Sequence, residues 1–175
     1  MKVTILAAAL TLPFAATSVL AAGGGEEKAP SKPKCETGLV YDKKAKKCVA
    51  AEESNLDVDG LYENVRELAY AGRYDEAQVV LSMMPQTDDR TLTYLGFTNR
   101  KQGNMDLAMA YYNEALRVNP ANVLARSYMA QGLVEQGLVT EAIAQLKEIR
   151  AHGGAGTWAE ASLRTAIATG RTFNY

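Results

Sequence analysis

The side chains able to do acid–base or nucleophilic chemistry are few and isolated. His152 is the one histidine of the 175 residues, and it stands at the end of a helical pattern, where an imidazole near free carbonyl groups is ordinary. Asp88 and Asp89 form a carboxylate pair, but acidic side chains at the start of a helical pattern favour the helix itself. No serine or cysteine has a second histidine as a base. The sequence predicts neither an enzyme nor a cofactor.

The two cysteines, Cys35 and Cys48, enclose a short β-prone segment with a turn near Asp42. A disulfide would replace the core that so short a hairpin cannot build, and closing a loop of this size contributes on the order of 3 kcal/mol. A metal site lacks further ligands nearby, and redox-active pairs are usually spaced C-x-x-C. The sequence therefore predicts a disulfide hairpin over residues 35–48, with a linker over 49–56.

The helices expected after the hairpin follow a pattern that recurs with a period of 34 residues. In the unit 89–122 the marked positions are Leu92, Leu95, Gly96, Gly103, Ala108, Tyr112, Ala115 and Pro120. One period later, from Val123, the matching positions are Ala130, Gly137, Ala142 and Leu146. Upstream, the same template fits Leu61, Val65, Gly72, Ala77, Leu81 and Met84.

Each residue type in this pattern has a physical reason. Gly96, Ala108 and Ala130 fall where two helices would cross closely, and glycines such as Gly103 end one helical stretch before the next begins. The pattern over residues 57–151 resembles the tetratricopeptide repeat, a pair of antiparallel helices that buries its apolar face only against neighbours. The resemblance implies an all-α solenoid of three helix-turn-helix repeats.

Residues 152–175 are expected to close the stack with a capping helix and a short tail. Thr157 and Glu160 have the spacing of a capping box, the next residues supply apolar surface, and Gly170 ends the helix. Phe173 and Tyr175 either fold back on this helix or stand exposed as anchors.

In the tetratricopeptide repeat family the first helix of each unit lines a concave groove that binds protein or peptide segments. The matching positions here are Tyr62, Arg66, Tyr70, Arg90, Thr93, Phe97, Arg100, Lys101, Ser127, Gln131 and Val134. Arginine and aromatic side chains together suit an acidic segment. The alternative is that these are ordinary solvated positions.

The first 22 residues are typical of a secretory signal peptide. Lys2 precedes an apolar stretch, and Ala21 and Ala22 provide small residues for cleavage. The alternative is a membrane anchor. Residues 23–34, rich in Gly, Glu, Lys and Pro, are expected to form a flexible linker. The sequence thus predicts a periplasmic or secreted protein.

The net charge of −1 hides two regions of opposite sign. Residues 28–48 hold seven lysines against Glu36 and Asp42, a net charge of +5, whereas residues 49–175 hold eleven Lys and Arg against sixteen Asp and Glu, a net charge of −5. The lysines form either a solvated face or a contact with an anionic envelope surface. Nucleic acid is not expected, because basic and aromatic residues do not alternate in this segment.

Two functions follow from these observations. The first is a periplasmic interaction module, an adaptor or assembly factor that binds a protein or peptide in the groove. The second is an envelope-surface protein held by the basic hairpin, with the repeats as a spacer. Reduction of the disulfide is expected to loosen the hairpin and leave the helical stack folded, because the repeats contain no cysteine.

Overall fold

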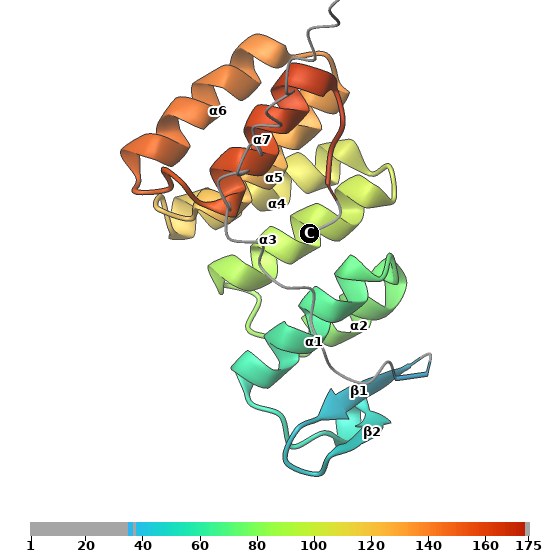
Figure 1. The fold of residues 1–175 in the computed structure, drawn as a ribbon. Coiled ribbons are helices and arrows are strands. Elements are labelled where there is room, and N and C mark those ends of the chain that lie inside the picture. The colour runs from blue at the N-terminus through green and yellow to red at the C-terminus, as the bar shows by residue number, and fades with distance from the viewer. Residues whose placement is uncertain (1–34, 37, 174–175) are drawn as a thin grey trace, which may run out of the picture.

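The computed structural model describes residues 35–36 and 38–173, and within them a hairpin is followed by seven helices (Figure 1). The strands are β1 (Leu39–Asp42) and β2 (Lys47–Ala50), and a 3-10 turn spans Ala51–Glu53. The helices are α1 (Val58–Tyr70), α2 (Tyr74–Ser82), α3 (Asp89–Lys101), α4 (Met105–Val118), α5 (Val123–Glu135), α6 (Val139–Ala151) and α7 (Trp158–Thr169). The expected signal peptide, the linker over 23–34 and Tyr175 lie outside the described residues.

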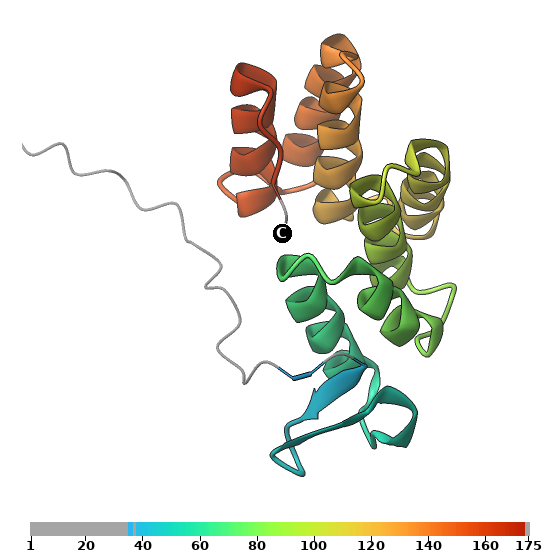
Figure 2. The ribbon, with the colours of Figure 1, turned by 90° about the vertical axis from the view of Figure 1, so that its right-hand side faces the viewer.

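The helices form three consecutive pairs, and α7 packs on the last pair, so the predicted all-α solenoid with a hairpin and a capping helix is confirmed. The first helices α1, α3 and α5 contact one another in series, and α5 contacts α7. We call the side of the molecule formed by these four helices the inner side. In Figure 2 the stack is bent.

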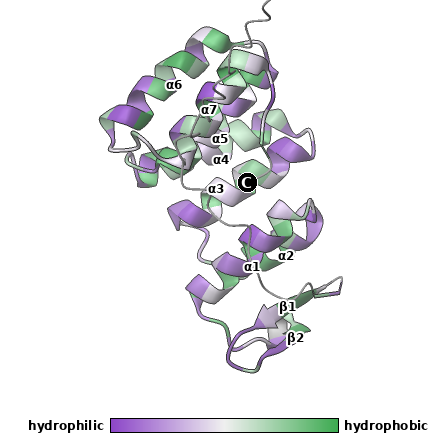
Figure 3. Cartoon of the chain, in the orientation of Figure 1, coloured by the Kyte–Doolittle hydropathy of each residue, from purple (hydrophilic) through white to green (hydrophobic). Residues whose placement is uncertain are grey.

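Small residues allow the close helix crossings that the sequence predicts. Ala108, Ala130 and Ala142 are fully buried, and Gly96 of α3 lies directly against the ring of Tyr112 in α4. A Cβ atom at Gly96 would stand 2.6 Å from two ring carbons of Tyr112. Gly103 ends α3 with a φ of +88°, a conformation that favours glycine. Figure 3 shows hydrophobic and hydrophilic residues interspersed along the helices.

The hairpin is antiparallel, with Val40 opposite Val49, and the disulfide joins Cys35, which precedes β1, to Cys48 of β2. It packs against the first repeat. Val40 is 2% exposed and belongs to the same core cluster as Leu61 of α1. The main chain of Tyr41 also exchanges hydrogen bonds with the side chain of Asn64. Because these apolar and polar contacts reach α1, the hairpin covers the N-terminal end of the stack.

A salt-bridged pair on α2 holds the start of the hairpin. The guanidinium of Arg73 donates to the carbonyl oxygens of Cys35 (2.8 Å) and Glu36 (3.0 Å), and Glu76 accepts from the N–H of Gly38 (2.7 Å). Arg73 and Glu76 bond to each other as well, which lowers the pKa of Glu76. The side chains of one helix thus satisfy main-chain groups 37 or 38 residues earlier in the chain.

The predicted capping box at α7 forms only in part. Thr157 is the N-cap residue, and its hydroxyl accepts from the N–H of Glu160, as expected. The carboxylate of Glu160 instead accepts from the N–H of Gly156 (2.7 Å) and from Arg150 (2.6 Å). Arg150 at the end of α6 competes for this carboxylate, so Glu160 ties α6 to α7. Across the described part of the chain, no helix is both long and apolar enough to cross a bilayer.

Candidate functional site

A cavity of about 390 Å³ opens between α1, the N-terminal end of α3 and the N-terminal end of α5. We call it the notch. Its lining residues are Tyr62, Asp89, Arg90, Thr93, Asn119, Ala121, Asn122, Val123 and Leu124. Three of the residues predicted for the groove, Tyr62, Arg90 and Thr93, therefore come together in one cavity.

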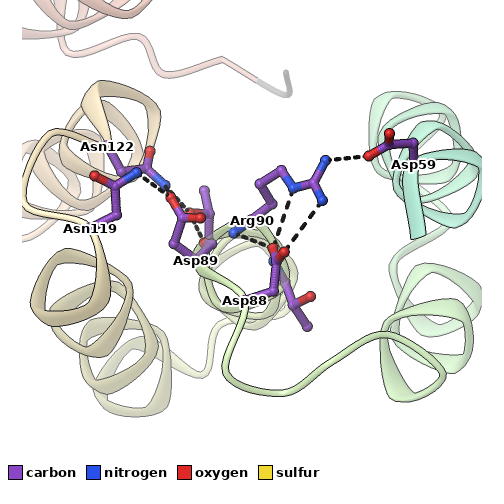
Figure 4. Close-up of polar contacts among 8 residues, drawn as sticks. Asp59, Asp88, Asp89, Arg90, Asn119 and Asn122 are labelled. Atoms are coloured by element: carbon purple, nitrogen blue, oxygen red, sulfur yellow. Dashed lines mark hydrogen bonds and ion pairs between the residues drawn. The ribbon is translucent and has the colours of Figure 1, made fainter.

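One wall of the notch is built around Arg90. Asp88 is the N-cap of α3, and its side chain accepts from the N–H groups of Arg90 (2.9 Å) and Thr91 (3.2 Å). The guanidinium then reaches Asp59 of α1 at 2.8 Å (Figure 4). It also lies over the ring of Tyr62, 5.0 Å from its centroid. An arginine stacked in this way is held in place by a cation–π contact and by acceptors on two helices.

The opposite wall is a network of amides around Asp89. Asn119 and Asn122 each donate to the same carboxylate oxygen of Asp89, at 2.7 and 2.8 Å (Figure 4). Asn122 also donates to the hydroxyl of Thr93 (3.0 Å), and its oxygen caps α5 by accepting from Ala125. The carboxylate pair of the sequence therefore has structural roles, because Asp88 starts α3 and Asp89 ties α3 to the loop before α5.

The charges of Asp88 and Arg90 are fixed at neutral pH. Burial alone would raise the pKa of Asp88, but hydrogen bonds from Arg90 and from the N–H of Thr91 hold it below its usual value. The hydrogen bonds to Asp59 and Asp88 raise the pKa of Arg90 further above its already high value. Arg90 thus presents a permanent positive charge beside an aromatic ring, a combination that suits a carboxylate with apolar neighbours.

The remaining groove residues on α1 and at the end of α3 lie near the surface. Tyr70 is 40% exposed, and Arg66 and Lys101 are half-buried. Burial, together with the neighbouring charge of Arg100, lowers the pKa of Lys101. None of these three lines the notch.

Four other expected groove residues are covered by neighbouring parts of the chain rather than open on a groove. Phe97, Ser127 and Gln131 are fully buried, and Arg100 is 3% exposed. The physical reason is that successive first helices contact each other, so these positions form the contact between neighbouring repeats. Val134 is half-buried against the cluster around Leu163 of α7.

Sequence reasoning missed a row of aromatic rings along the inner side. Contacting rings run from α1 through α3 and α5 to α7 and the residues after it, with centroids 4.7 to 6.2 Å apart. The rings are Tyr62, Tyr94, Phe97, Tyr128, Trp158 and Phe173. Tyr94 and Tyr128 received no role in the sequence analysis, although the two residues lie 34 positions apart on the first helices of successive repeats. Their burial fills the space in which a deeper groove would otherwise lie.

The comparisons with known proteins agree with this architecture. A sequence model of the tetratricopeptide repeat matches residues 100–167, from the end of α3 into α7. No curated protein and no solved structure matched the chain. The match supports assigning residues 100–167 to the tetratricopeptide repeat family, and the helix pairs and glycine turns of the described residues agree with that assignment. Such repeats mediate protein–protein interactions and are typically non-catalytic scaffolds.

Proposed function

We propose that this protein is an exported adaptor or assembly factor that binds a segment of a protein partner on its inner side. The notch receives an acidic side chain of that segment. The observation that carries the proposal is the placement of Arg90, whose guanidinium is cradled by Tyr62 and Asp88 and turned toward the 82% exposed Asp59. An arginine anchored on one side and solvated on the other can donate hydrogen bonds to a partner carboxylate.

The exchange of Asp59 for a partner carboxylate costs little. An exposed ion pair of this kind contributes roughly 0–1 kcal/mol, because both charges are well solvated when apart. Asp88 keeps its hydrogen bonds to the guanidinium and so holds Arg90 in position during the exchange. The Tyr62 ring gives the partner segment an apolar surface next to the charge, and aromatic residues commonly supply much of the affinity at interfaces.

Capture of a partner by Arg90→Gln and by a matched control tests this function. Arg117→Gln is the control, because Arg117 is exposed, pairs with Glu114 within α4 and does not line the notch. The two variants and the wild-type chain are used to capture proteins from an envelope extract, and the captured protein is identified and titrated in purified form. We expect Arg90→Gln to weaken binding about tenfold or more and Arg117→Gln to leave it unchanged. Equal binding by all three chains would remove the notch as the site.

Export is part of the proposal. It is supported by the signal-like pattern of the first 22 residues and by the Cys35–Cys48 pair, since structural disulfides belong to oxidising compartments. Sequencing of the N-terminus of material recovered from the periplasm tests it, with a start at Ala22 or Gly23 as the expected result. Recovery of a chain that begins at Met1 would contradict cleavage.

The lysines of the hairpin turn favour a second candidate function, contact with an anionic envelope surface. Lys44, Lys46 and Lys47 are exposed on a hairpin that is fixed to α2, so they move with the whole stack. Replacing these three lysines by Gln should abolish binding to vesicles that contain anionic lipid, whereas the matched replacement of Arg117, Lys147 and Arg164 should not. Retention of full vesicle binding by the lysine variant would exclude this function.

A further inference from the structure

The residues that follow α7 turn back onto the inner side of the stack. Gly170 ends α7 in a left-handed conformation with a φ of +71°, and the chain then reverses direction. Residues Arg171–Phe173, which we call the tail, run back along α7 toward the middle of the bend (Figure 2). The tail has no regular secondary structure. Three of its contacts are with side chains of α5 and α7.

The first contact is with the main chain of the tail. The N–H of Phe173 donates to the side-chain oxygen of Gln131, at 2.9 Å. Gln131 is fully buried, and its amide nitrogen is directed to the hydroxyls of Ser127 (3.3 Å) and Ser162 (3.5 Å). This arrangement orients the amide, so its oxygen is held ready to accept from an extended backbone.

The second contact is with a hydroxyl group. Thr172 donates to a carboxylate oxygen of Glu135 (2.6 Å), and the same oxygen accepts from the buried guanidinium of Arg100 (2.9 Å). The Arg100 side chain is 0% exposed, whereas that of Glu135 is 30% exposed. Arg100 therefore fixes the carboxylate from below and leaves its outer edge accessible to the hydroxyl.

The third contact is with an aromatic ring. Phe173 meets Trp158 edge to face, with centroids 6.2 Å apart and an interplanar angle of 79°. Trp158 in turn meets Tyr128 in the same geometry, at 6.0 Å. The tail thus supplies the last ring of the aromatic row, and α1, α3, α5 and α7 supply the earlier rings.

We propose that Gln131, Glu135 and Trp158 form a docking site for an extended segment in which a hydroxyl-bearing residue precedes an aromatic one, and that Thr172 and Phe173 occupy it as an internal ligand. The three contacts recognise a backbone N–H, a hydroxyl and a ring, and none depends on the tail being covalently attached. A tethered segment acts at an effective concentration in the millimolar range, so a partner segment must displace it. This inference rests on the proposed function, because it names a class of partner for the inner side.

The test uses the full chain and its single tryptophan, Trp158, as a reporter. The probe is a labelled peptide with the sequence of residues 169–175, TGRTFNY, added to the wild-type chain and to Phe173→Ala. We expect the variant to bind the peptide about tenfold or more tightly than the wild type, because its own tail no longer competes. Peptide binding should shift the Trp158 emission, and the peptide with Ala in place of Phe should not bind.

Thr172→Val gives a second comparison, because it keeps the ring and removes the hydroxyl that bonds to Glu135. It should also bind the peptide more tightly than the wild type, and it replaces Phe173→Ala in the test if that variant loses helicity. Equal affinity of the wild type and both variants, no binding to any of them, or binding of the Ala peptide would each overturn the proposal. A concentration-dependent dimer that disappears in Phe173→Ala would assign the tail to a second copy and overturn the internal arrangement. Loss of partner capture in Arg90→Gln is independent of these results, because the notch and the tail site share no residue.

Discussion

Replacing Gly96 by Ala tests the central packing contact of the second repeat. The new Cβ atom would stand 2.6 Å from Cδ1 and Cε1 of Tyr112 and 3.1 Å from its Cγ. Tyr112 is fully buried, so its ring cannot swing away without moving its neighbours. The helices must then separate, and overpacking of this kind costs about 1–3 kcal/mol.

A gain in helix propensity opposes this cost. Ala is more favourable than Gly inside a helix by about 1 kcal/mol. The buried ring places the clash in the upper part of its range, about 2–3 kcal/mol. Gly96→Ala should therefore lower the free energy of unfolding by about 1–2 kcal/mol.

Gly132 provides a matched control in the following repeat. A Cβ atom there would meet Met109 Cε at 2.9 Å, Arg100 Cδ at 3.0 Å and Met105 Sδ at 3.3 Å. Two of these contacts are with unbranched methionine side chains, which adjust more easily than a buried ring. The propensity gain and the smaller clash should nearly cancel, so Gly132→Ala should change the free energy of unfolding by less than about 0.5 kcal/mol.

Urea denaturation followed by circular dichroism at 222 nm measures both variants against the wild type. The expected result is a clear shift to lower urea for Gly96→Ala and almost none for Gly132→Ala, at unchanged slopes. A Gly96→Ala chain as stable as the wild type would mean that Tyr112 and Gly96 do not pack as described, and the position of the helix crossing would be wrong.

Three further predictions concern the hairpin, the helix caps and the buried inner side. Reduction of Cys35–Cys48 should increase hydrogen exchange in the hairpin and α1 but not in α5 to α7; uniform loss of protection would show a stack that depends on the disulfide throughout. The pKa of Asp88 is lower in the folded chain, so its contribution is present above the usual pKa near 4 and is lost as the pH falls below it; Asp88→Asn should flatten this part of a stability–pH curve, and an unchanged curve would contradict the assignment. Phe97→Ala should destabilise by about 3–5 kcal/mol in thermal or urea unfolding, whereas a surface residue would change stability little.

The fold was predictable because its signals are local and repeat along the chain. The glycine turn at Gly103 and the close packing at Gly96 each depend on residues of one helix pair, and a fixed period repeats them. The packing of the hairpin on α1 was not predictable in the same way. It depends on Asn64 and Arg73 reaching main-chain groups 23 to 38 residues away, and no spacing rule links these residues.

The candidate site was predictable in part for the same reason. Repeat positions assign Arg90 and Phe97 to the inner side of α3, but they do not tell which of the two the next helix covers. Arg90 lies at the N-terminal end of α3 and remains 36% exposed, whereas Phe97 lies mid-helix against Tyr128 of α5. The asparagines of the notch carried a usable signal, since Asn122 directly precedes a helical pattern and is a favoured N-cap residue.

The burial of the middle of the inner side limits where a partner can be recognised. Phe97 and Arg100 fill the contact between α3 and α5, so their replacement removes core volume and a buried charge together with any contact. Loss of binding in such a variant would report unfolding as readily as recognition. The N-terminal end of α3 and the tail are different, because Arg90 is 36% exposed and Thr172 and Phe173 lie half-buried outside the helices, so these residues can be changed without opening the core. Recognition and stability can therefore be separated experimentally at the notch and at the tail, but not at Phe97.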